Sequence, residues 1–272
     1  APAHCRHPQG SAQADGRAGT MKLEYVISAS YGNDSMAVIQ QAHERGIQNV
    51  TVAYCDTGWA APGWDKRVAD GEALATRYGF QFARIHSMGM EELVRMKKGF
   101  PAHGMQFCTL WLKGLPFLDW IDSVDPEGKA IVMIGKRRDE SPDRAETPEW
   151  VESSQYHGGR KVWHPLAYVT KSQRDELLAR AGVEILPHRS DECSPCVNAN
   201  RFDLRRLGRI QRDRLASLER EVGQPMFRAE KHSGAEGIEQ VIKWANYSPG
   251  KFKKGQDDLF IEDCGSPFGC GL

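Results

Sequence analysis

The sequence predicts an α/β protein with a doubly wound, mostly parallel sheet, because strand-like and helix-like segments alternate from residue 25 onward. Apolar runs at 25–27, 50–55 and 80–85 predict three strands, and helical patterns follow from residue 36, over 59–78 and over 91–97. Such alternation joins parallel strands through right-handed crossovers. The run at 130–135 is the clearest strand. Ligands of such sheets bind at the carboxyl ends of the strands.

The composition is that of a globular protein. The 272 residues are 40% hydrophobic and 26% charged, enough to bury a large core. The formal net charge is zero and the isoelectric point is near 7.3, so no global field attracts nucleic acid, although a local basic face is compatible with this balance. No apolar run is long enough to cross a bilayer, and the first residues lack the apolar segment of a secretory signal. We therefore expect a cytoplasmic protein with no membrane partner.

The segments outside the alternating pattern are assigned from local signals. Residues 1–20 are small, polar and aperiodic, so we expect a disordered extension outside the fold. The stretch 99–113 predicts a loop that enters a helix, and 163–166 a short strand or turn. A helix is expected over 171–182, with Ser172 as its N-cap and Gly182 as its stop. A long Arg-rich helix is expected over 198–222.

The loop between the first strand and the first helix has the composition of an anion site. It consists of Ser30, Tyr31, Gly32, Asn33, Asp34 and Ser35. Unpaired backbone N–H groups and the positive end of a helix dipole meet at such a loop, and Gly32 lets the backbone approach an oxyanion closely. The expected guest is a phosphate. Taken alone, the loop is equally well explained as an ordinary capped strand-to-helix connection.

Two further segments are predicted at the same rim of the sheet. Asp56 and Thr57 end the second strand, and a charged cluster at 136–144 follows the strand at 130–135. Charged clusters are usually solvated loops. Because this one lies at the carboxyl end of a strand, its position favours anion binding.

The seven cysteines of a chain expected in the cytoplasm should not be read as a disulfide framework. Cys55 lies within a predicted strand and is expected to be a small core residue. Cys193 and Cys196 form a Cys-x-x-Cys pair, which suits a soft metal centre and leaves zinc, an iron–sulfur cluster and a redox dithiol open. Further candidate ligands are Cys108, Cys264 and Cys270.

The order and spacing of these motifs resemble the PAPS reductase-like family of the adenine-nucleotide alpha-hydrolase (PP-loop ATP pyrophosphatase) superfamily, in its iron–sulfur cluster-bearing branch, over 21–206. Residues 30–35 are similar to the family's S-x-G-x-D-S loop, and 56–58 to its D-T-G. Its G-x-R-x-x-E-S-x-x-R motif is matched by Gly135, Arg137, Glu140, Ser141 and Arg144. The segments around Cys108 and the Cys193–Cys196 pair are similar to those of the cluster-bearing reductases.

The resemblance implies a set of ligands. An adenine nucleotide, ATP or else APS or PAPS, is expected with Mg²⁺ at the loop 30–35 and at Asp56, Thr57, Gly135 and Arg137. A 4Fe–4S cluster is expected on Cys108, Cys193, Cys196 and Cys264, with Cys270 or a non-protein group as the alternative fourth ligand. Residues 21–190 would then form the nucleotide-binding domain, and 191–272 a helical, cysteine-bearing region packed on it.

Two positions depart from the family pattern. Asn33 stands where many members have Lys, so one cationic contact to the phosphates is expected to be missing or to come from Lys136, Arg137 or Arg138. The relatives usually have paired cysteines where this chain has Cys108 followed by Thr109, which leaves the fourth ligand open.

Two enzymatic interpretations follow from the resemblance. In the first, ATP is cleaved at its α-phosphate to adenylate a substrate that then takes up sulfur with the help of the cluster, and Asp34, Arg137, Glu140 and Arg144 are the catalytic candidates. In the second, the thiolate of Cys270 reduces APS or PAPS and a thiol carrier releases sulfite. The sequence ends in Cys-Gly-Leu without the Glu and His that usually flank it, which favours the first interpretation.

A third interpretation is a non-enzymatic nucleic-acid-binding or assembly protein on the same scaffold. Arg205, Arg209 and Arg212 would share one face of a continuous helix over 198–222. The acidic residues of that segment predict instead a solvated, salt-bridged helix. For the enzyme, the expected partners are a sulfur donor or thiol carrier protein and, as the modified molecule, DNA or tRNA. A homodimer is left open.

Overall fold

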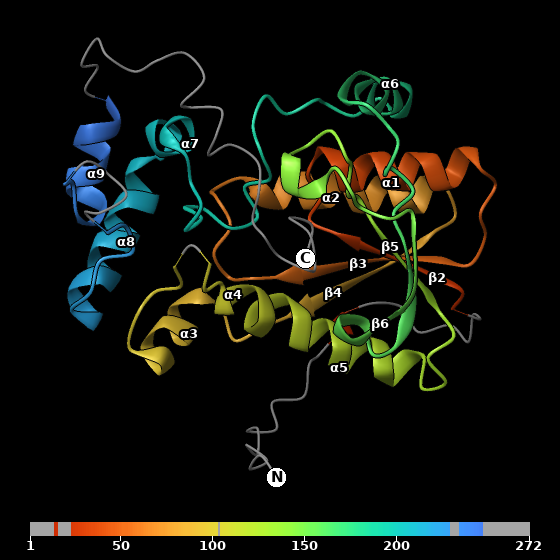
Figure 1. Cartoon of the computed structure of the whole chain (residues 1–272), viewed down its shortest axis with the longest axis horizontal. Helices are drawn as coiled ribbons and strands as arrows, with labels where there is room; N and C mark the ends of the chain where they lie inside the picture. Colours follow the sequence, from red (N-terminus) through yellow and green to blue (C-terminus); the bar gives the residue numbers. More distant parts are fainter. Residues whose placement is uncertain (1–13, 16–22, 103, 229–233, 247–272) are drawn as a thin grey trace.

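A single mixed sheet forms the centre of the protein. The computed structural model describes residues 14–15, 23–102, 104–228 and 234–246 (Figure 1). The strands are β1 (Ala14–Asp15), β2 (Tyr25–Ala29), β3 (Val50–Asp56), β4 (Gln81–His86), β5 (Ile131–Ile134), β6 (Trp150–Ser154) and β7 (Arg160–Trp163). Their order is β1-β4-β3-β2-β5-β7-β6. The inner strands are parallel, and β1 and β6 pair antiparallel at the edges.

Helices cover both faces of this sheet. On one face lie α1 (Asn33–Glu44), α2 (Trp64–Arg77) and α6 (Lys171–Ala181), and on the other lies α5 (Leu115–Val124) (Figure 1). Successive strand residues point to opposite faces. Ile27 and Val52 therefore pack under α1 and α2, whereas Val26 and Ala53 pack against α5. The doubly wound, mostly parallel α/β fold expected from the sequence is confirmed.

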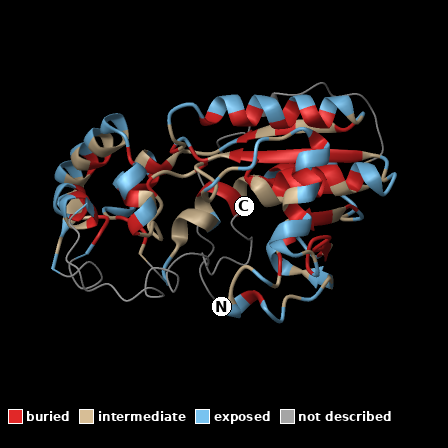
Figure 2. Cartoon of the chain, turned by 90° about the horizontal axis from the view of Figure 1, so that it is seen from above, coloured by how far each residue is buried: buried red, intermediate tan, exposed pale blue. Residues whose placement is uncertain are grey.

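The C-terminal helices enclose a separate apolar core. This core is built by α3 (Met90–Lys97), α7 (Arg201–Arg206), α8 (Arg209–Val222) and α9 (Gly237–Asn246). Leu204, Leu215, Phe227 and Val241 are buried in it, together with Trp59 from the rim of the sheet. In Figure 2 the inward sides of these helices are buried and their outer sides exposed.

The segment before α5 is helical rather than a loop. It consists of α4 (Phe107–Thr109) and a π-helical turn, η1 (Leu110–Gly114), which runs directly into α5. Cys108 therefore lies on a helical turn, contrary to the expected loop. Single-turn π-helical insertions are frequent at functional sites.

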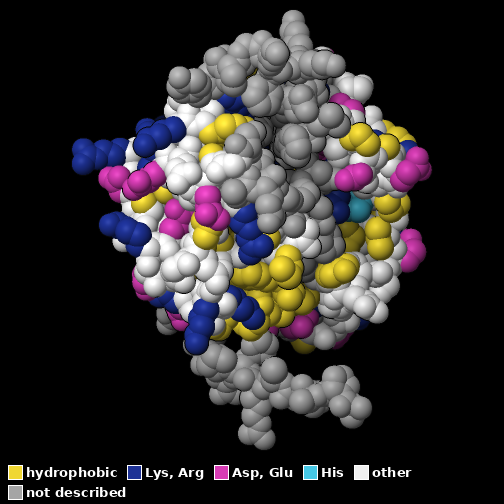
Figure 3. Space-filling model, turned by 60° about the vertical axis from the view of Figure 1, so that its left-hand side comes forward, with side chains coloured by type: hydrophobic (Ala, Val, Ile, Leu, Met, Phe, Trp, Pro, Cys, Tyr) yellow, Lys and Arg dark blue, Asp and Glu magenta, His cyan; other side chains and the backbone are white. Residues whose placement is uncertain are grey.

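The prediction of one Arg-rich helix over 198–222 is wrong, because this segment forms two helices. The chain breaks at Leu207 and Gly208, which are extended with ψ of 122° and 167°, and this break separates α7 from α8. Arg205 and Arg209 consequently lie on different helices. The Arg205 side chain donates to the Ala245 carbonyl at 2.6 Å. Figure 3 shows Lys and Arg interspersed with Asp and Glu on the face where these helices come forward.

Three smaller expectations also need correction. Thr170, not Ser172, caps α6, because its hydroxyl accepts from the Gln173 N–H in a capping box. The edge strand β6 was not expected, since its residues are mostly exposed and polar. Ala14 and Asp15, within the expected disordered extension, pair with β4.

Among the residues that the structure describes, no helix has both the length and the apolar character needed to cross a membrane.

Candidate functional site

A cavity of about 700 Å³ opens at the carboxyl ends of the parallel strands. It brings together two segments that the sequence placed on this rim and three cysteines that were expected as metal ligands. Its lining includes Ser30, Gly32, Asn33, Asp34 and Ser35 from the first loop, Gly135, Arg137, Glu140 and Arg144 from the segment after β5, and Cys108, Cys193 and Cys196. We refer to it as the rim cavity. Its size lies within the usual range for small-molecule and cofactor sites.

The first loop presents a helix terminus to the rim cavity. Gly32 is the N-cap of α1 and has no side chain to cap it. The Gly32 N–H donates to Ser30 Oγ at 3.3 Å, and the Ser35 hydroxyl donates to the Gly32 carbonyl at 3.3 Å. A Cβ on Gly135 would approach the Asp34 backbone within 3.0 Å, so glycine lets the two segments meet. These features suit an anion at the start of α1.

Two residues of the first loop have structural roles. Tyr31 is fully buried, with a positive φ of 57°, and its ring packs on Tyr54 away from the rim cavity. The Asn33 side chain donates to the Leu186 carbonyl at 2.8 Å and accepts from the Leu186 N–H at 3.0 Å. Asn33 therefore fastens the loop to the segment that leads to Cys193. This contact gives a physical reason for an amide where relatives have Lys.

Arginine side chains supply the positive charge of the rim cavity. Asp34 Oδ1 accepts from Arg137 at 2.7 Å and from Arg174 at 3.2 Å, and both arginine side chains are 7% exposed. Arg144 pairs with Glu140 beside them. Arg174 could not be predicted as a site residue, because nothing in the helical pattern of α6 distinguishes it from the other charged residues there. Lys171 also lines the cavity.

The Glu140 carboxyl carries a perturbed pKa. Its burial and the neighbouring charge of Asp34 raise the pKa from 4.5 to about 7, although Arg144 and the Arg137 N–H act in the opposite direction. Between these two values the folded chain holds a proton that the unfolded chain has lost. Stability therefore falls as the pH rises through this window.

Replacing Glu140 by Gln should remove this pH dependence. The quantity to follow is the difference between the unfolding free energies of the wild type and of Glu140→Gln. We expect the stability of the wild type relative to the variant to fall by up to about 3 kcal/mol between pH 4.5 and about 7. Urea denaturation of both proteins across this range measures the difference. A difference that stays constant with pH would contradict the raised pKa.

The three described cysteines of the predicted metal site line the same cavity. Cys108 comes from α4, and Cys193 and Cys196 from the loop before α7. Burial raises the pKa of the Cys108 thiol to about 11, and Cys196 adds to this shift. Burial also raises the pKa of the Cys193 thiol, with Cys196 and Cys108 contributing. The thiols are thus close enough to influence one another.

The three thiols are suitable ligands for a thiophilic metal centre. They offer three half-buried sulfur ligands in one cavity, which is the ligand chemistry of iron–sulfur clusters. Within the described ranges, no group of three or more His, Cys, Asp or Glu side chains is arranged as a metal site. Cys264 and Cys270, the candidates for the fourth ligand, lie outside the described residues, as does the Cys-Gly-Leu end.

The Cys-x-x-Cys loop is held in place by contacts with the rim and with η1. Lys113 Nζ donates to Glu192 Oε1 at 2.5 Å, with both side chains buried. The Thr57 hydroxyl donates to the Glu192 carbonyl at 2.9 Å. The Trp59 indole N–H donates to the Pro195 carbonyl at 3.0 Å. The helix that carries Cys108 and the loop that carries the other two thiols are thereby joined.

Asp56 lies beside the rim cavity rather than in it. Its carboxylate accepts from the Gly58 N–H at 2.8 Å and lies 4.0 Å from His86. Thr57, the next residue, lines the cavity.

Cys55 is 2% exposed in the core, as expected, and burial raises its pKa to about 12.

The fold and this rim cavity define a doubly wound α/β protein with an arginine-rich anion site beside half-buried thiols. The phosphoadenosine phosphosulfate reductase domain model matches residues 24–194, more than half of the 272. The chain therefore belongs to the phosphoadenosine phosphosulfate reductase domain family.

Individual relatives are more distant. An uncharacterized 37.8 kDa protein of Escherichia phage 186 is 30% identical over 120 residues, which are 42% of this chain and 36% of that protein. This chain thus spans about a third of that relative's length.

Two solved structures overlap with this fold. The phosphoadenylyl-sulfate reductase of Candida auris, in a phosphate complex, has a TM-score of 0.43 and 15% identity, and the overlap covers 61% of this chain and 76% of that one. A U34-tRNA thiolase of Methanococcus maripaludis, with its 4Fe–4S cluster, has a TM-score of 0.44 and 15% identity. Its overlap covers 86% of this chain and 76% of that one. The family membership rests on the domain match alone, because these TM-scores and identities are too low to show it.

Proposed function

We propose that the protein is an enzyme that binds ATP in the rim cavity and cleaves it at the α-phosphate to adenylate a substrate for sulfur transfer. The observation that carries this proposal is the shared lining of the cavity: the phosphate-loop residues and three cysteines face one volume. A nucleotide held by the loop would lie within reach of the thiols. DNA or tRNA remains the candidate acceptor.

The chain's own residues would act mainly by position and charge. The N–H groups at the start of α1 would hold the β- and γ-phosphates. A substrate oxygen would attack the α-phosphorus, the bond to the bridging oxygen would break, and pyrophosphate would leave with the bonding electrons. Arg137, Arg144 and Arg174 would stabilise the charge that develops on the leaving group. Asp34 would orient two of these arginines.

Two cofactors belong to the proposal. Asp34 and Glu140 already accept hydrogen bonds from arginines, so Mg²⁺ is expected to be bound mainly by the nucleotide phosphates and water. Cys108, Cys193 and Cys196 would hold an iron–sulfur cluster, with the fourth position filled by Cys264, Cys270 or a non-protein ligand. When bound, such a cluster supplies iron that can hold sulfur near the activated substrate.

Pyrophosphate release from ATP tests this function. The isosteric change Asp34→Asn is expected to lower release about 100-fold, because it loosens the orientation of Arg137 and Arg174. Asp65→Asn is the matched control, since Asp65 occupies the first turn of α2 and does not line the rim cavity. Equal losses in both variants, or no pyrophosphate release by the wild type, would contradict the proposal.

Sulfite release distinguishes the second candidate function. The domain match to a phosphoadenosine phosphosulfate reductase favours a sulfonucleotide reductase as the alternative. That enzyme would release sulfite from APS or PAPS, and Cys270→Ser would abolish the release. ATP cleavage without sulfite release supports the first function, and the reverse pattern supports the reductase.

A further inference from the structure

One basic side chain of the rim cavity has no role in the proposed function. His188 lines the cavity with a side chain that is 14% exposed, on the segment between α6 and the Cys-x-x-Cys loop. Two contacts hold this segment against the loop 30–35. Leu186 bonds with the Asn33 side chain in both directions, and a Cβ on Gly32 would lie 3.1 Å from the Cβ of Ser190. His188 lies midway between these two contacts in sequence, so its backbone runs beside the loop.

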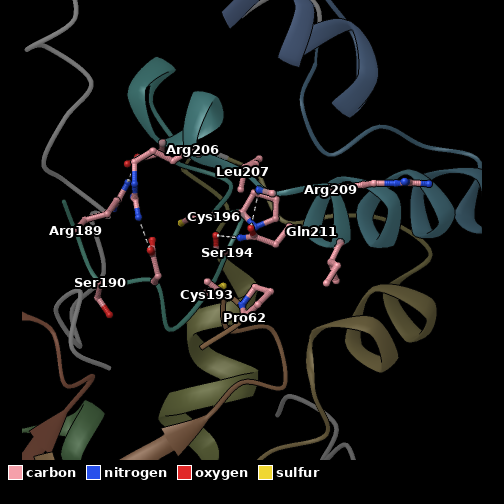
Figure 4. A pocket seen from close by; sticks show the side chains of 17 residues that line it. Pro62, Arg189, Ser190, Cys193, Ser194, Cys196, Arg206, Leu207, Arg209 and Gln211 are labelled. Carbon is pink, nitrogen blue, oxygen red and sulfur yellow. Dashed lines mark hydrogen bonds and ion pairs between the residues drawn. The ribbon is translucent and has the colours of Figure 1, made fainter. Parts of the chain in front are cut away.

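The ring of His188 is oriented through its Nδ1 atom. Nδ1 lies 2.8 Å from the Arg189 carbonyl oxygen, which can only accept a hydrogen bond, so Nδ1 carries the proton of the neutral ring. The Asp191 carboxylate lies 3.4 Å from the same nitrogen. Arg206 also pairs with this carboxylate, at 2.7 Å, and Figure 4 shows its side chain extending from α7 toward the segment of Arg189 and Ser190. Nε2 is therefore the unprotonated nitrogen, and no residue in the described part of the chain bonds to it.

The carboxylates that line the rim cavity are engaged with cations. Each one that the structure describes there pairs with an arginine or a lysine. These pairs are Asp34 with Arg137, Glu140 with Arg144, Glu192 with Lys113 and Asp203 with Arg189. A neighbouring cation favours the ionised carboxylate and so weakens it as a base. Glu140 is the competing candidate, because burial and Asp34 nevertheless raise its pKa to about 7.

We propose that His188 Nε2 is the general base that takes the proton lost by the attacking substrate in the cleavage of ATP. This inference rests on the proposed function. As the substrate oxygen forms its bond to the α-phosphorus, the proton of the attacking group passes to Nε2, and pyrophosphate leaves with the electrons of the broken P–O bond. Asp191, beside Nδ1, would stabilise the imidazolium that forms. Water takes up the proton before the next turnover.

Pyrophosphate release by the anaerobically purified full-length protein, with Mg²⁺, ATP and bulk tRNA or genomic DNA as the acceptor, tests this role. His188→Ala is expected to lower kcat about 100-fold or more. Its affinity for α,β-methylene-ATP, which cannot be cleaved at the α-phosphate, should change little. Added imidazole should restore part of the lost rate, because it replaces the missing base. His43→Ala is the matched control, since His43 is exposed on the last turn of α1 and does not line the cavity.

The kinetic outcomes decide between a base and a structural residue. A His188→Ala variant that keeps the wild-type kcat would overturn the role, and so would a loss that imidazole does not restore. A larger loss of kcat in Glu140→Gln, together with no rescue of His188→Ala, would assign the base to Glu140 instead.

Modification by diethyl pyrocarbonate separates this inference from the proposed function, because the reagent attacks an unprotonated imidazole nitrogen. We expect α,β-methylene-ATP to slow the modification of His188 but not that of His43, as read from peptide masses. Protection of His188 without any pyrophosphate release by the wild type would overturn the proposed function and not the location of His188. Pyrophosphate release without protection would overturn the role of His188 and not the proposed function.

Discussion

Replacing Arg137 by Met is expected to lower pyrophosphate release from ATP by about 100- to 1,000-fold. The Arg137 side chain is 7% exposed, lines the rim cavity and donates to Asp34 at 2.7 Å. In the proposed reaction it lies where negative charge develops on the leaving pyrophosphate. Its loss removes a fixed positive charge from a site largely shielded from water. Steady-state kcat/KM for pyrophosphate release measures the effect.

The neighbouring arginine provides the control for this experiment. Arg138 donates to the Thr147 carbonyl at 2.8 Å and lies over the ring of Tyr168 at 4.3 Å, and it does not line the rim cavity. Arg138→Met should therefore retain nearly all activity while making the same change in net charge. Similar losses in both variants would indicate a general effect of charge or folding and would contradict the role of Arg137.

Replacing Lys113 by Met is expected to cost about 3–5 kcal/mol of unfolding free energy. Lys113 and Glu192 pair at 2.5 Å, with side chains only 11% and 5% exposed. The substitution leaves the Glu192 carboxylate buried without this cation. It also breaks a link between the helix of Cys108 and the loop of Cys193. We therefore expect the iron content of anaerobically purified protein to fall well below about four atoms per chain.

A surface pair and a double substitution serve as controls. Lys129 pairs with Glu127, but these side chains are 79% and 69% exposed, so Lys129→Met should cost far less unfolding free energy than Lys113→Met. The double variant Lys113→Met, Glu192→Leu should recover much of the stability, because the buried carboxylate is removed together with its cation. Chemical denaturation and metal analysis of the same samples give both quantities. Wild-type protein that is colourless and contains zinc would contradict the cluster.

The elements predicted best from sequence are those whose residues are buried on both sides. The strands β2, β3 and β5 appear as apolar runs because helices cover both faces of the sheet. The edge strand β6 gives no such signal, since its pattern is mostly exposed. The break at Leu207 and Gly208 has a sequence signal, because glycine is a poor helix former, but a single glycine inside a helical pattern is often tolerated and tertiary packing decides where the helix ends.

The residues of the candidate site also divide into those that the sequence predicts and those that it does not. The loop 30–35 and the segment after β5 could be expected at one rim, because each follows a predicted strand. The three described cysteines were expected to share a cluster only from the resemblance, and their place in the same cavity as the loop comes from the structure. Arg174, the Lys113–Glu192 pair and the bond between Asn33 and Leu186 could not be predicted. Each joins residues far apart in the chain, and the last spans 153 positions. Their partners are set by the packing of α6, η1 and the Cys-x-x-Cys loop.

The fastening of Asn33 to Leu186 has a thermodynamic consequence for the two halves of the site. Arg67 strengthens the same junction, because it donates to the Tyr31 carbonyl at 3.0 Å and to the Glu184 carbonyl at 2.9 Å. The phosphate loop and the chain leading to Cys193 are thus attached through hydrogen bonds on both sides. If nucleotide binding shifts this junction and changes the affinity of the thiols for their ligand, that ligand must change the affinity for nucleotide by the same factor.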